Sequence, residues 1–184
     1  MFNATLEKTG DTGKIWREFW KLGEARTNAP GIRARVMLMK PEAPNCRQFL
    51  VETGSGHNFV VDDPAGGTGP KPIELVAAAL AGCTGFDVIT ILRSKKRQLV
   101  TGYEVQVEAE QAERPPQVFV AVRIHHIVTG HDIDAAAVSD AIRISEEKHC
   151  SVEAMLKHSA VLRTTFEVIN ETAAPPHSWH MERR

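Results

Sequence analysis

The sequence predicts an α+β fold with the element order βββαββααβ, and three observations lead to this prediction. Six extended runs are separated by turn residues, as strands are. One long apolar stretch and two later segments have the length and spacing of helices. The chain has 184 residues, of which 42% are hydrophobic and 24% charged, so one globular domain with a sizeable core is expected.

The first half predicts a meander followed by the central helix. Three runs, over residues 32–39, 47–53 and 57–63, are separated by "KPEAPN" and "GSG", which are turn sequences. The Gly/Pro loop "DPAGGTGPKP" comes next, and Pro72 at the first helical turn begins the central helix. This helix is expected to end near "RSKKRQ", where cations are favourable at a helix C-terminus.

The second half predicts two long strands, two helices and a final strand. The strands cover residues 100–109 and 117–128 and are joined by a turn around "ERPP". Asp132 or Asp134 caps the helix "AAAVSDAIRIS". Cys150 opens the shorter helix "SVEAMLKH", and "VLRTTFEVI" forms the last strand.

Charge and composition exclude several classes of partner. The net charge is −1 and the calculated pI about 6.7, without blocks of like charge, so neither nucleic acid nor an anionic membrane surface is an expected partner. The start "MFNATLEKTGDTG" lacks the pattern of a secretory signal, which predicts a cytoplasmic protein. Glu74 and Asp87 interrupt the longest apolar region, leaving runs shorter than the roughly 18 residues that a membrane span needs.

The central helix also predicts the assembly and the domain limits. Nearly every residue over 75–82 is apolar, so the helix needs cover on all sides, and a second copy of the chain is the simplest cover. A homodimer is therefore expected. We expect residues 1–30 to form a helical extension whose apolar stripe packs on the dimer, residues 31–170 to form the domain, and residues 171–184 to form a polar tail.

Three cysteines, Cys46, Cys83 and Cys150, occur without Cys-x-x-Cys pairs, which leaves reactive thiols or buried filler as alternatives. Zinc is not expected, since His-Glu-x-x-His is absent, His125 and His126 would point to opposite faces of a strand, and a site needs three or four convergent ligands. No other cofactor is expected either. Cys46 lies in a predicted turn, and we expect no role for it.

The surroundings of Cys83 favour a reactive thiol. Gly82 and Gly85 weaken the helix around it, a local conflict that is typical of functional sites, and they would leave space beside the sulfur for a substrate. Cys150 precedes a helix, whose dipole should lower the pKa of its thiol. The alternative is that both residues are small buried hydrophobes.

Two cysteine-bearing segments, "GPKPIELVAAALAGCTGFDVITIL" and "EEKHCSVEAML", resemble the paired motifs of the OsmC/Ohr superfamily of osmotically inducible and organic hydroperoxide resistance proteins. "SGHNFVVDD" and "PPQVFVAVRIHHIVTG" are similar to its YhfA-like branch, and the resemblance covers about residues 31–169. It implies an OsmC-like fold, in which two sheets wrap the central cysteine-bearing helices of an intertwined homodimer.

The resemblance also implies a function, a thiol-dependent peroxidase that reduces organic hydroperoxides in oxidative stress defence and is regenerated by a dithiol. In this role Cys83 attacks the peroxide and Cys150 resolves the product. Glu74 matches a family glutamate that positions an activating arginine. It precedes Cys83 by nine residues, so it would act across the dimer interface or through another group. The alternative is a first-turn glutamate that favours the helix dipole.

The chain departs from the family at the activating arginine, which is missing from "HNFVVDDPAGGTGPKP". Arg33, Arg35 and Arg47 lie on neighbouring predicted strands, and His57 could supply a cation instead. Asp87, one turn after Cys83, is expected to make a structural polar contact. The alternative function is a non-enzymatic dimer that binds a small apolar ligand or senses oxidation.

Overall fold

The computed structural model describes residues 32–39, 47–63 and 67–171. Its element order matches the predicted one, with a π-helical turn after each of the two longer helices, so the predicted fold class is confirmed. The predicted N-terminal helix, Cys46 and the tail beyond residue 171 lie outside the described residues. The elements are β1 (Ala34–Leu38), β2 (Phe49–Thr53), β3 (Asn58–Val61), α2 (Pro72–Thr90), η1 (Ile91–Lys95), β4 (Leu99–Gln111), β5 (Phe119–His131), α3 (Ala135–Ile144), η2 (Ser145–His149), α4 (Ser151–Leu156) and β6 (Val161–Asn170).

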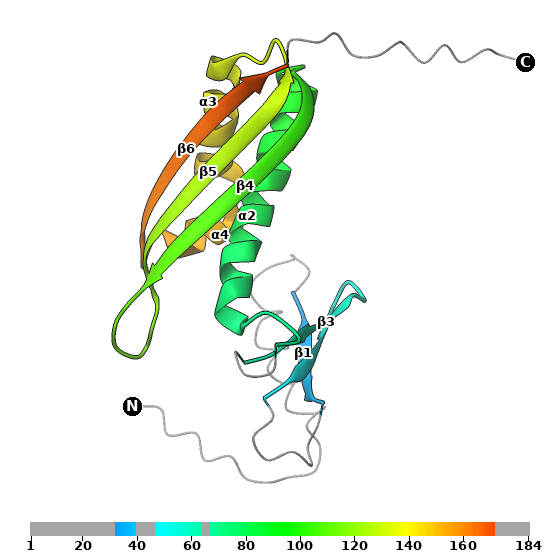
Figure 1. Ribbon diagram of the computed structural model, residues 1–184, viewed down its shortest axis with the longest axis vertical. Helices are drawn as coiled ribbons and strands as arrows, with labels where there is room; N and C mark the ends of the chain where they lie inside the picture. Colours follow the sequence, from blue (N-terminus) through cyan, green and yellow to red (C-terminus); the bar gives the residue numbers. More distant parts are fainter. Residues whose placement is uncertain (1–31, 40–46, 64–66, 172–184) are drawn as a thin grey trace, which may run out of the picture.

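The strands β1, β2 and β3 form an antiparallel meander, as the turn sequences predict. Val36 of β1 pairs with Val51 of β2, which pairs in turn with Phe59 of β3. Gly56 in the β2–β3 turn has a φ of +83°, a conformation that favours glycine. Figure 1 shows this small sheet beyond the N-terminal end of α2, apart from the second sheet.

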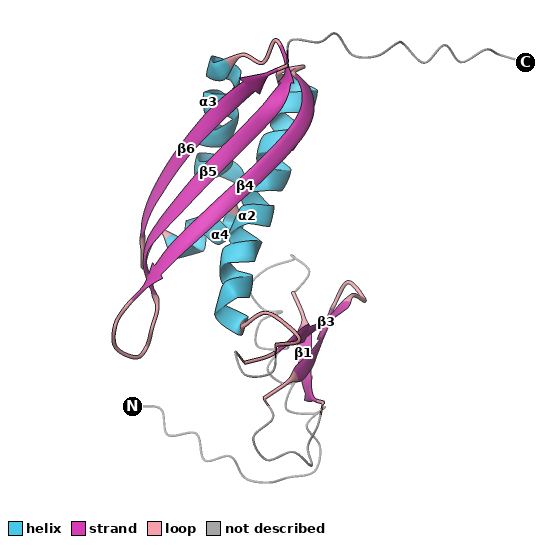
Figure 2. Ribbon diagram, viewed as in Figure 1, coloured by secondary structure: helices cyan, strands magenta, loops and turns pink. Residues whose placement is uncertain are grey.

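The second sheet has the order β4-β5-β6, and the helices cover one of its faces. The strands β4 and β5 form an antiparallel hairpin, whereas β6 lies parallel to β5. A parallel pair needs a crossover, which α3, η2 and α4 supply. Alternate residues of β5 are buried, and Figures 1 and 2 show α2, α3 and α4 lying against one side of the sheet.

The β4–β5 hairpin is longer than the sequence predicts. The predicted strands end at residues 109 and 128, but β4 extends to Gln111 and β5 to His131. The β4–β5 pairing has a register shift near each end of β4, where one strand contributes an extra residue. The two strands therefore stay paired where the alternation of apolar and polar residues in the sequence is interrupted.

Helix α2 begins as predicted and presents one buried stripe. Pro72 occupies the first turn, and the Glu74 carboxylate accepts a hydrogen bond from the backbone N–H of Lys71, the residue before the helix. Leu80, Thr84 and Val88 are the buried residues of α2. They recur every four residues, so they share one face, which packs into the core.

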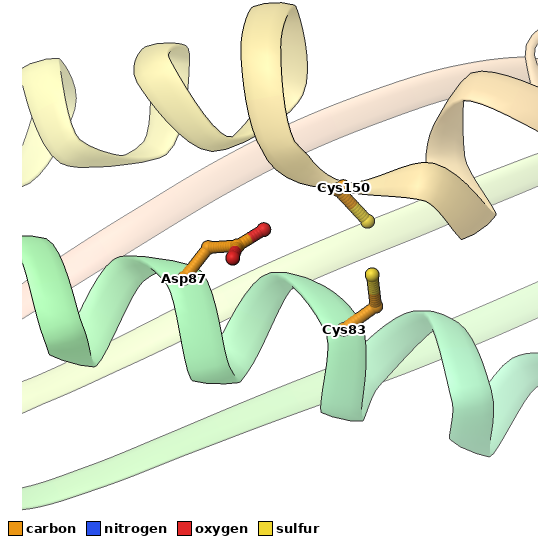
Figure 3. A group of neighbouring side chains, drawn as sticks. All are labelled: Cys83, Asp87 and Cys150. Carbon is orange, nitrogen blue, oxygen red and sulfur yellow. The ribbon is translucent and has the colours of Figure 1, made fainter. Parts of the chain in front are cut away.

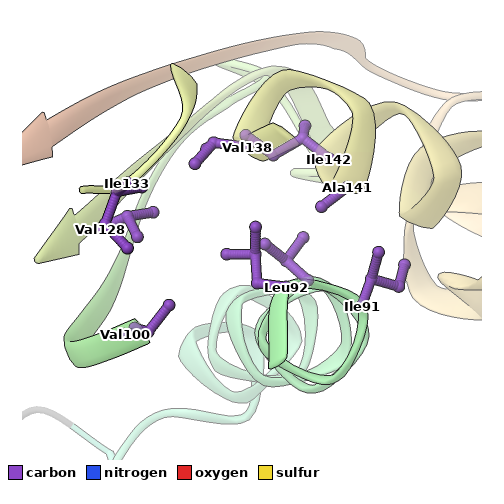
Figure 4. Packing of buried hydrophobic residues seen from close by; sticks show 9 residues of the cluster. Ile91, Leu92, Val100, Val128, Ile133, Val138, Ala141 and Ile142 are labelled. Atoms are coloured by element: carbon purple, nitrogen blue, oxygen red, sulfur yellow. The ribbon is translucent and has the colours of Figure 1, made fainter. Parts of the chain in front are cut away.

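Two clusters of buried hydrophobic residues fill the space between the helices and the second sheet. Figure 4 shows the first, which contains Leu92 from the π-helical end of the long helix, Val128 of β5 and Ala141 of α3. The second contains Leu80 and Cys150 together with β5 side chains, and Cys83 packs against it. Both cysteines therefore border the core.

None of the described residues of the chain covers the opposite face of α2. Ala78, Gly82 and Phe86 are exposed and recur every four residues, and Phe86 is 78% exposed. The continuous helix over residues 72–95 is long and apolar enough to cross a membrane, a test that the core helix of a soluble protein also passes. The sequence predicts cover on all sides of this helix, and residues 32–39, 47–63 and 67–171 of one chain supply it on one side only.

A polar pair, formed by the half-buried Tyr103 and the buried His126, lies on the inner face of the second sheet. The Tyr103 hydroxyl lies 2.7 Å from Nδ1 of His126, and the two rings are stacked. Burial, and to a smaller extent the charge of His125, lowers the pKa of His126 to about 4. His126 is therefore neutral at pH 7. Its neighbour His125 lies on the other face and contacts Thr165, so the predicted opposite orientation is confirmed.

Candidate active site

The fold brings Cys83 and Cys150 together. Cys83 lies in the middle of α2 and is half-buried, whereas Cys150 lies between η2 and α4 and is buried. Figure 3 shows the two thiols pointing toward each other, with Asp87 one turn along α2. The two sulfurs and a carboxylate oxygen of Asp87 all lie within 4.8 Å of one another.

The beginning of α4 supplies hydrogen bonds to Cys83. Burial by itself raises the pKa of the Cys83 thiol, but hydrogen bonds outweigh this effect and hold the pKa below its ordinary value. The donors are the backbone N–H of Val152, the Cys150 thiol, and the hydroxyl and backbone N–H of Ser151. The Ser151 hydroxyl lies 3.9 Å from the sulfur. More of Cys83 is therefore ionised at neutral pH than of an ordinary cysteine.

Cys150 shows the opposite behaviour. Burial is the main cause that raises the pKa of the Cys150 thiol to about 12. A hydrogen bond from the Glu153 backbone N–H lowers this pKa, whereas the interactions with Cys83 and with the Glu153 charge raise it further. That N–H lies 3.4 Å from the Cys150 sulfur. The predicted lowering of the Cys150 pKa is therefore wrong, since burial outweighs its place before the helix.

The two glycines beside Cys83 differ in their surroundings. A Cβ added at Gly85 would lie 3.5 Å from Val105 and 3.9 Å from Tyr103, both on β4. The predicted role of Gly85 in leaving space beside the sulfur is therefore wrong, because this glycine faces the sheet. A Cβ at Gly82 would meet nothing within 4 Å, which places Gly82 on the open side of α2.

Asp87 makes the expected polar contact and also borders the thiols. The Ser145 hydroxyl donates to Oδ2 of Asp87 at 3.2 Å, and it lies 3.4 Å from the Thr84 hydroxyl. Ser145 and Thr84 are buried, so this chain of contacts fixes the carboxylate between α2 and η2. Sequence reasoning noticed that Asp87 shares a face with Cys83, but it missed the convergence with Cys150.

Glu74, the third predicted catalytic residue, lies at the N-terminal end of α2. Its carboxylate accepts a hydrogen bond from the Lys71 backbone N–H at 2.9 Å and lies 3.9 Å from Lys71 Nζ. It precedes Cys83 by nine residues, or roughly 13 Å along the helix axis. The structure thus places Glu74 in a helix cap, away from the thiols of its own chain.

The arginines considered from the sequence lie on or beside the small sheet. Arg35 forms an ion pair with Glu52 at 2.6 Å, and Arg47 forms one with Asp63 at 2.8 Å. The backbone carbonyl of Arg33 accepts a hydrogen bond at the edge of this sheet. His57 contacts Ser55 in the exposed β2–β3 turn.

Glu153 is a neighbour of the thiols that sequence reasoning missed. Its side chain is buried, and its Oε2 atom has no hydrogen-bond partner among the described residues. Burial, and then the charge of Glu146, raises the pKa of Glu153 to about 7, although Lys157 opposes the rise. The sequence signal that could have found Glu153 is its position three residues after Cys150. Acidic residues are common at this position in the first turn of a helix.

A family model described as OsmC-like protein matches residues 65–165, which include both described thiols, Asp87 and Glu74. This chain belongs to the OsmC-like family. Protein YhfA of Escherichia coli strain K12 is 40% identical over 121 residues, which cover 66% of this chain and 90% of that protein. The resemblance to the family, including its YhfA-like branch, is confirmed.

Solved structures show the same OsmC-like fold. A hypothetical protein from Aquifex aeolicus VF5 has a TM-score of 0.67 and 29% identity, over 78% of this chain and 99% of that one. An organic hydroperoxide resistance protein OsmC from Legionella pneumophila has a TM-score of 0.55 and 16% identity, over 79% of this chain and 100% of the other. At 16% identity, the second likeness concerns the fold alone.

Proposed function

We propose that this OsmC-like protein is a thiol-dependent peroxidase that reduces organic hydroperoxides, with Cys83 as the attacking thiol and Cys150 as the resolving thiol. The observation that carries the proposal is the pairing of a half-buried sulfur, supplied with hydrogen-bond donors, with a second, buried sulfur within 4.8 Å. The division of roles follows from access, because a peroxide reaches a half-buried sulfur before a buried one.

The reaction balances with these two thiols and an external dithiol. The Cys83 thiolate attacks the O–O bond, becomes a sulfenic acid, and releases an alkoxide that takes a proton from solvent to give the alcohol. The Cys150 thiol then attacks the sulfenic acid, so that a Cys83–Cys150 disulfide forms and water leaves. A dithiol reduces this disulfide and is itself oxidised to a disulfide.

Family membership supports the proposal, since OsmC-like neighbours include a protein named for organic hydroperoxide resistance. The activation of Cys83 differs from the arginine-based activation that the resemblance implies. Within the part of the chain that the structure describes, the donors are the Val152 amide, the Cys150 thiol and Ser151. These are neutral groups, which stabilise a thiolate less than a guanidinium does, so we expect a slower reaction than in arginine-containing relatives.

We also propose that the protein is a cytoplasmic homodimer without a membrane span, and that it does not bind nucleic acid. The uncovered face of α2 supports the dimer, because its residues Ala78, Gly82 and Phe86 are small or apolar and lie in a row. A second copy would cover this face and remove Phe86 from water. Glu74 would then act, if at all, from the partner's side of the interface.

The test of the proposed peroxidase measures the oxidation state of the two thiols directly. The fully reduced protein receives one equivalent of cumene hydroperoxide, and its disulfides are mapped by mass spectrometry of peptides. We expect a Cys83–Cys150 link, and in the Cys150→Ser variant a sulfenic acid at Cys83 that a dimedone reagent traps. Catalytic consumption of peroxide with dithiothreitol should require Cys83, and the Cys46→Ser variant is the control that should retain it.

Two results would contradict this proposal. If both thiols stay reduced and react slowly with alkylating reagents, they are core residues, and the non-enzymatic dimer becomes the better interpretation. If the sulfenic acid forms at Cys150 instead, the assignment of roles is reversed.

A further inference from the structure

The thiol pair has a third neighbour that the peroxidase reaction does not use. The carboxylate of Asp87 and the sulfurs of Cys83 and Cys150 lie within 4.8 Å of one another, and Figure 3 shows the three side chains converging from α2 and from the residue before α4. Two thiolates and one carboxylate are a ligand set that suits Zn²⁺. We propose that the reduced protein binds one Zn²⁺ ion through Cys83, Asp87 and Cys150.

The spacing of the three ligand atoms is close to what zinc requires. With Zn–S near 2.3 Å and Zn–O near 2.0–2.2 Å, tetrahedral ligand atoms lie roughly 3.5–3.8 Å apart. Since the ligand atoms lie at most 4.8 Å apart, binding needs a contraction of at most about 1.0–1.3 Å, which is within the range of side-chain rotation. Three protein ligands leave the fourth position to water, the usual arrangement at an open zinc site.

Each ligand also has a hydrogen-bond donor of its own. The Val152 N–H donates to the Cys83 sulfur, the Glu153 N–H donates to the Cys150 sulfur, and the Ser145 hydroxyl donates to the Asp87 carboxylate. Such outer contacts orient metal ligands and offset their negative charge. Zn²⁺ with three anionic ligands carries a net charge of −1, so donors around the site are needed.

Metal access and exchange follow from the burial of the ligands. Cys83 and Asp87 are half-buried and Cys150 is buried, so the ion would enter from the Cys83 side. Binding would displace the two thiol protons. While zinc holds both sulfurs they are not free to attack a peroxide, and their oxidation to a disulfide would remove two ligands. The site would therefore bind zinc in the reduced state only.

The experiment uses Co²⁺ as a spectroscopic substitute for Zn²⁺. The reduced, tag-free chain carrying Cys46→Ser is freed of metal and titrated with Co²⁺. We expect one equivalent to produce the near-ultraviolet charge-transfer absorption of Co²⁺–thiolate bonds, and one equivalent of Zn²⁺ to abolish it. The Cys83→Ser and Cys150→Ser variants should each lose about half of the absorption per bound ion.

Asp87→Asn tests the carboxylate. The amide oxygen can still accept the hydrogen bond from Ser145, so the fold should survive, whereas Zn²⁺ affinity measured by competition with a chromogenic chelator should fall at least tenfold. The matched control is Asp134→Asn, because asparagine caps a helix as well as aspartate does. This control should bind zinc like the wild-type protein.

Three results would overturn the proposal: no thiolate absorption with Co²⁺, the same absorption in disulfide-oxidised protein, or an unchanged Zn²⁺ affinity in Asp87→Asn. The outcome is separate from that of the peroxidase test. Zinc binding without peroxide consumption by the metal-free protein would refute the proposed enzyme alone, and the reverse result would refute the metal site alone.

Discussion

The hydroxyl of Ser151 lies 3.9 Å from the sulfur of Cys83, although 68 positions separate the two residues in the sequence. Ser151 begins α4, directly after the second thiol. Ser151 therefore follows one thiol in the sequence and donates hydrogen bonds to the other, Cys83, in the folded protein.

Removing this hydroxyl should make Cys83 a weaker acid. In Ser151→Ala the thiolate loses one hydrogen bond while the backbone donors remain, so the pKa of Cys83 should rise. The measurement is the rate of iodoacetamide alkylation of Cys83 as a function of pH, whose midpoint should shift to higher pH. Ser159→Ala is the matched control, since its hydroxyl donates to the Leu156 carbonyl instead. An unshifted midpoint in Ser151→Ala would show that the hydroxyl does not stabilise the thiolate.

The assembly prediction concerns Phe86. Wild-type protein at micromolar concentration should sediment at twice the chain mass of 20.3 kDa, and Phe86→Glu should move the mass toward one chain, because a charge would be buried in the proposed interface. Ile169→Glu is the control: Ile169 is also exposed, but it lies on β6 away from α2. A wild-type mass near 20 kDa would contradict the dimer.

The two glycines give a paired prediction. Gly85→Ala should raise the free energy of unfolding by about 0.5–1 kcal/mol, because alanine favours helix and its Cβ would meet Val105 at an ordinary 3.5 Å. Its peroxide rate constant should be unchanged. Gly82→Leu should instead move the sedimentation mass toward one chain, because its side chain would fill the proposed interface beside Phe86. Urea unfolding, stopped-flow fluorescence and sedimentation provide the measurements; a slower reaction in Gly85→Ala, or a Gly82→Leu variant that stays dimeric, would contradict the prediction.

His126 should make the protein less stable in acid. Its pKa of about 4 in the folded state lies below the ordinary 6.5, so the unfolded chain binds the additional proton between these values. The stabilising contribution is complete above pH 6.5 and is lost as the pH falls, by roughly 3 kcal/mol at pH 4. The double variant Tyr103→Phe/His126→Leu removes both polar partners and should lack this loss. Urea unfolding of both proteins from pH 7 to pH 4, at fixed protein concentration, measures the difference; parallel curves would contradict the prediction.

Local signals in the sequence were sufficient to predict the fold. Pro72 begins α2 as predicted, and Asp134, one of the two caps predicted for α3, is the residue that caps it. Capping and the geometry of a first turn depend only on neighbouring residues. Strand ends were less accurate, since the β4–β5 ladder continues through irregularities that alternation does not predict.

The site was predicted in part. The two cysteine motifs identified the thiols, but the lowered pKa was assigned to Cys150 from its place before a helix. The structure shows that burial dominates at Cys150, while the neighbouring Val152 amide points at Cys83. Burial and the direction of an amide depend on tertiary packing, which a sequence does not display. The convergence of Asp87 with both sulfurs was missed for the same reason.

The crossover from β5 to β6 carries Cys150 to α2, and this has a consequence during synthesis. Cys83 leaves the ribosome 68 residues before Ser151. Until the crossover docks, α4 supplies no donors to Cys83, which therefore remains an ordinary thiol of low reactivity. Bringing Cys83 and Ser151 together closes a long loop, and the entropy lost in doing so is offset by the packing of the completed core. We therefore expect Cys83 of a nascent chain to be oxidised more slowly than Cys83 of the folded protein.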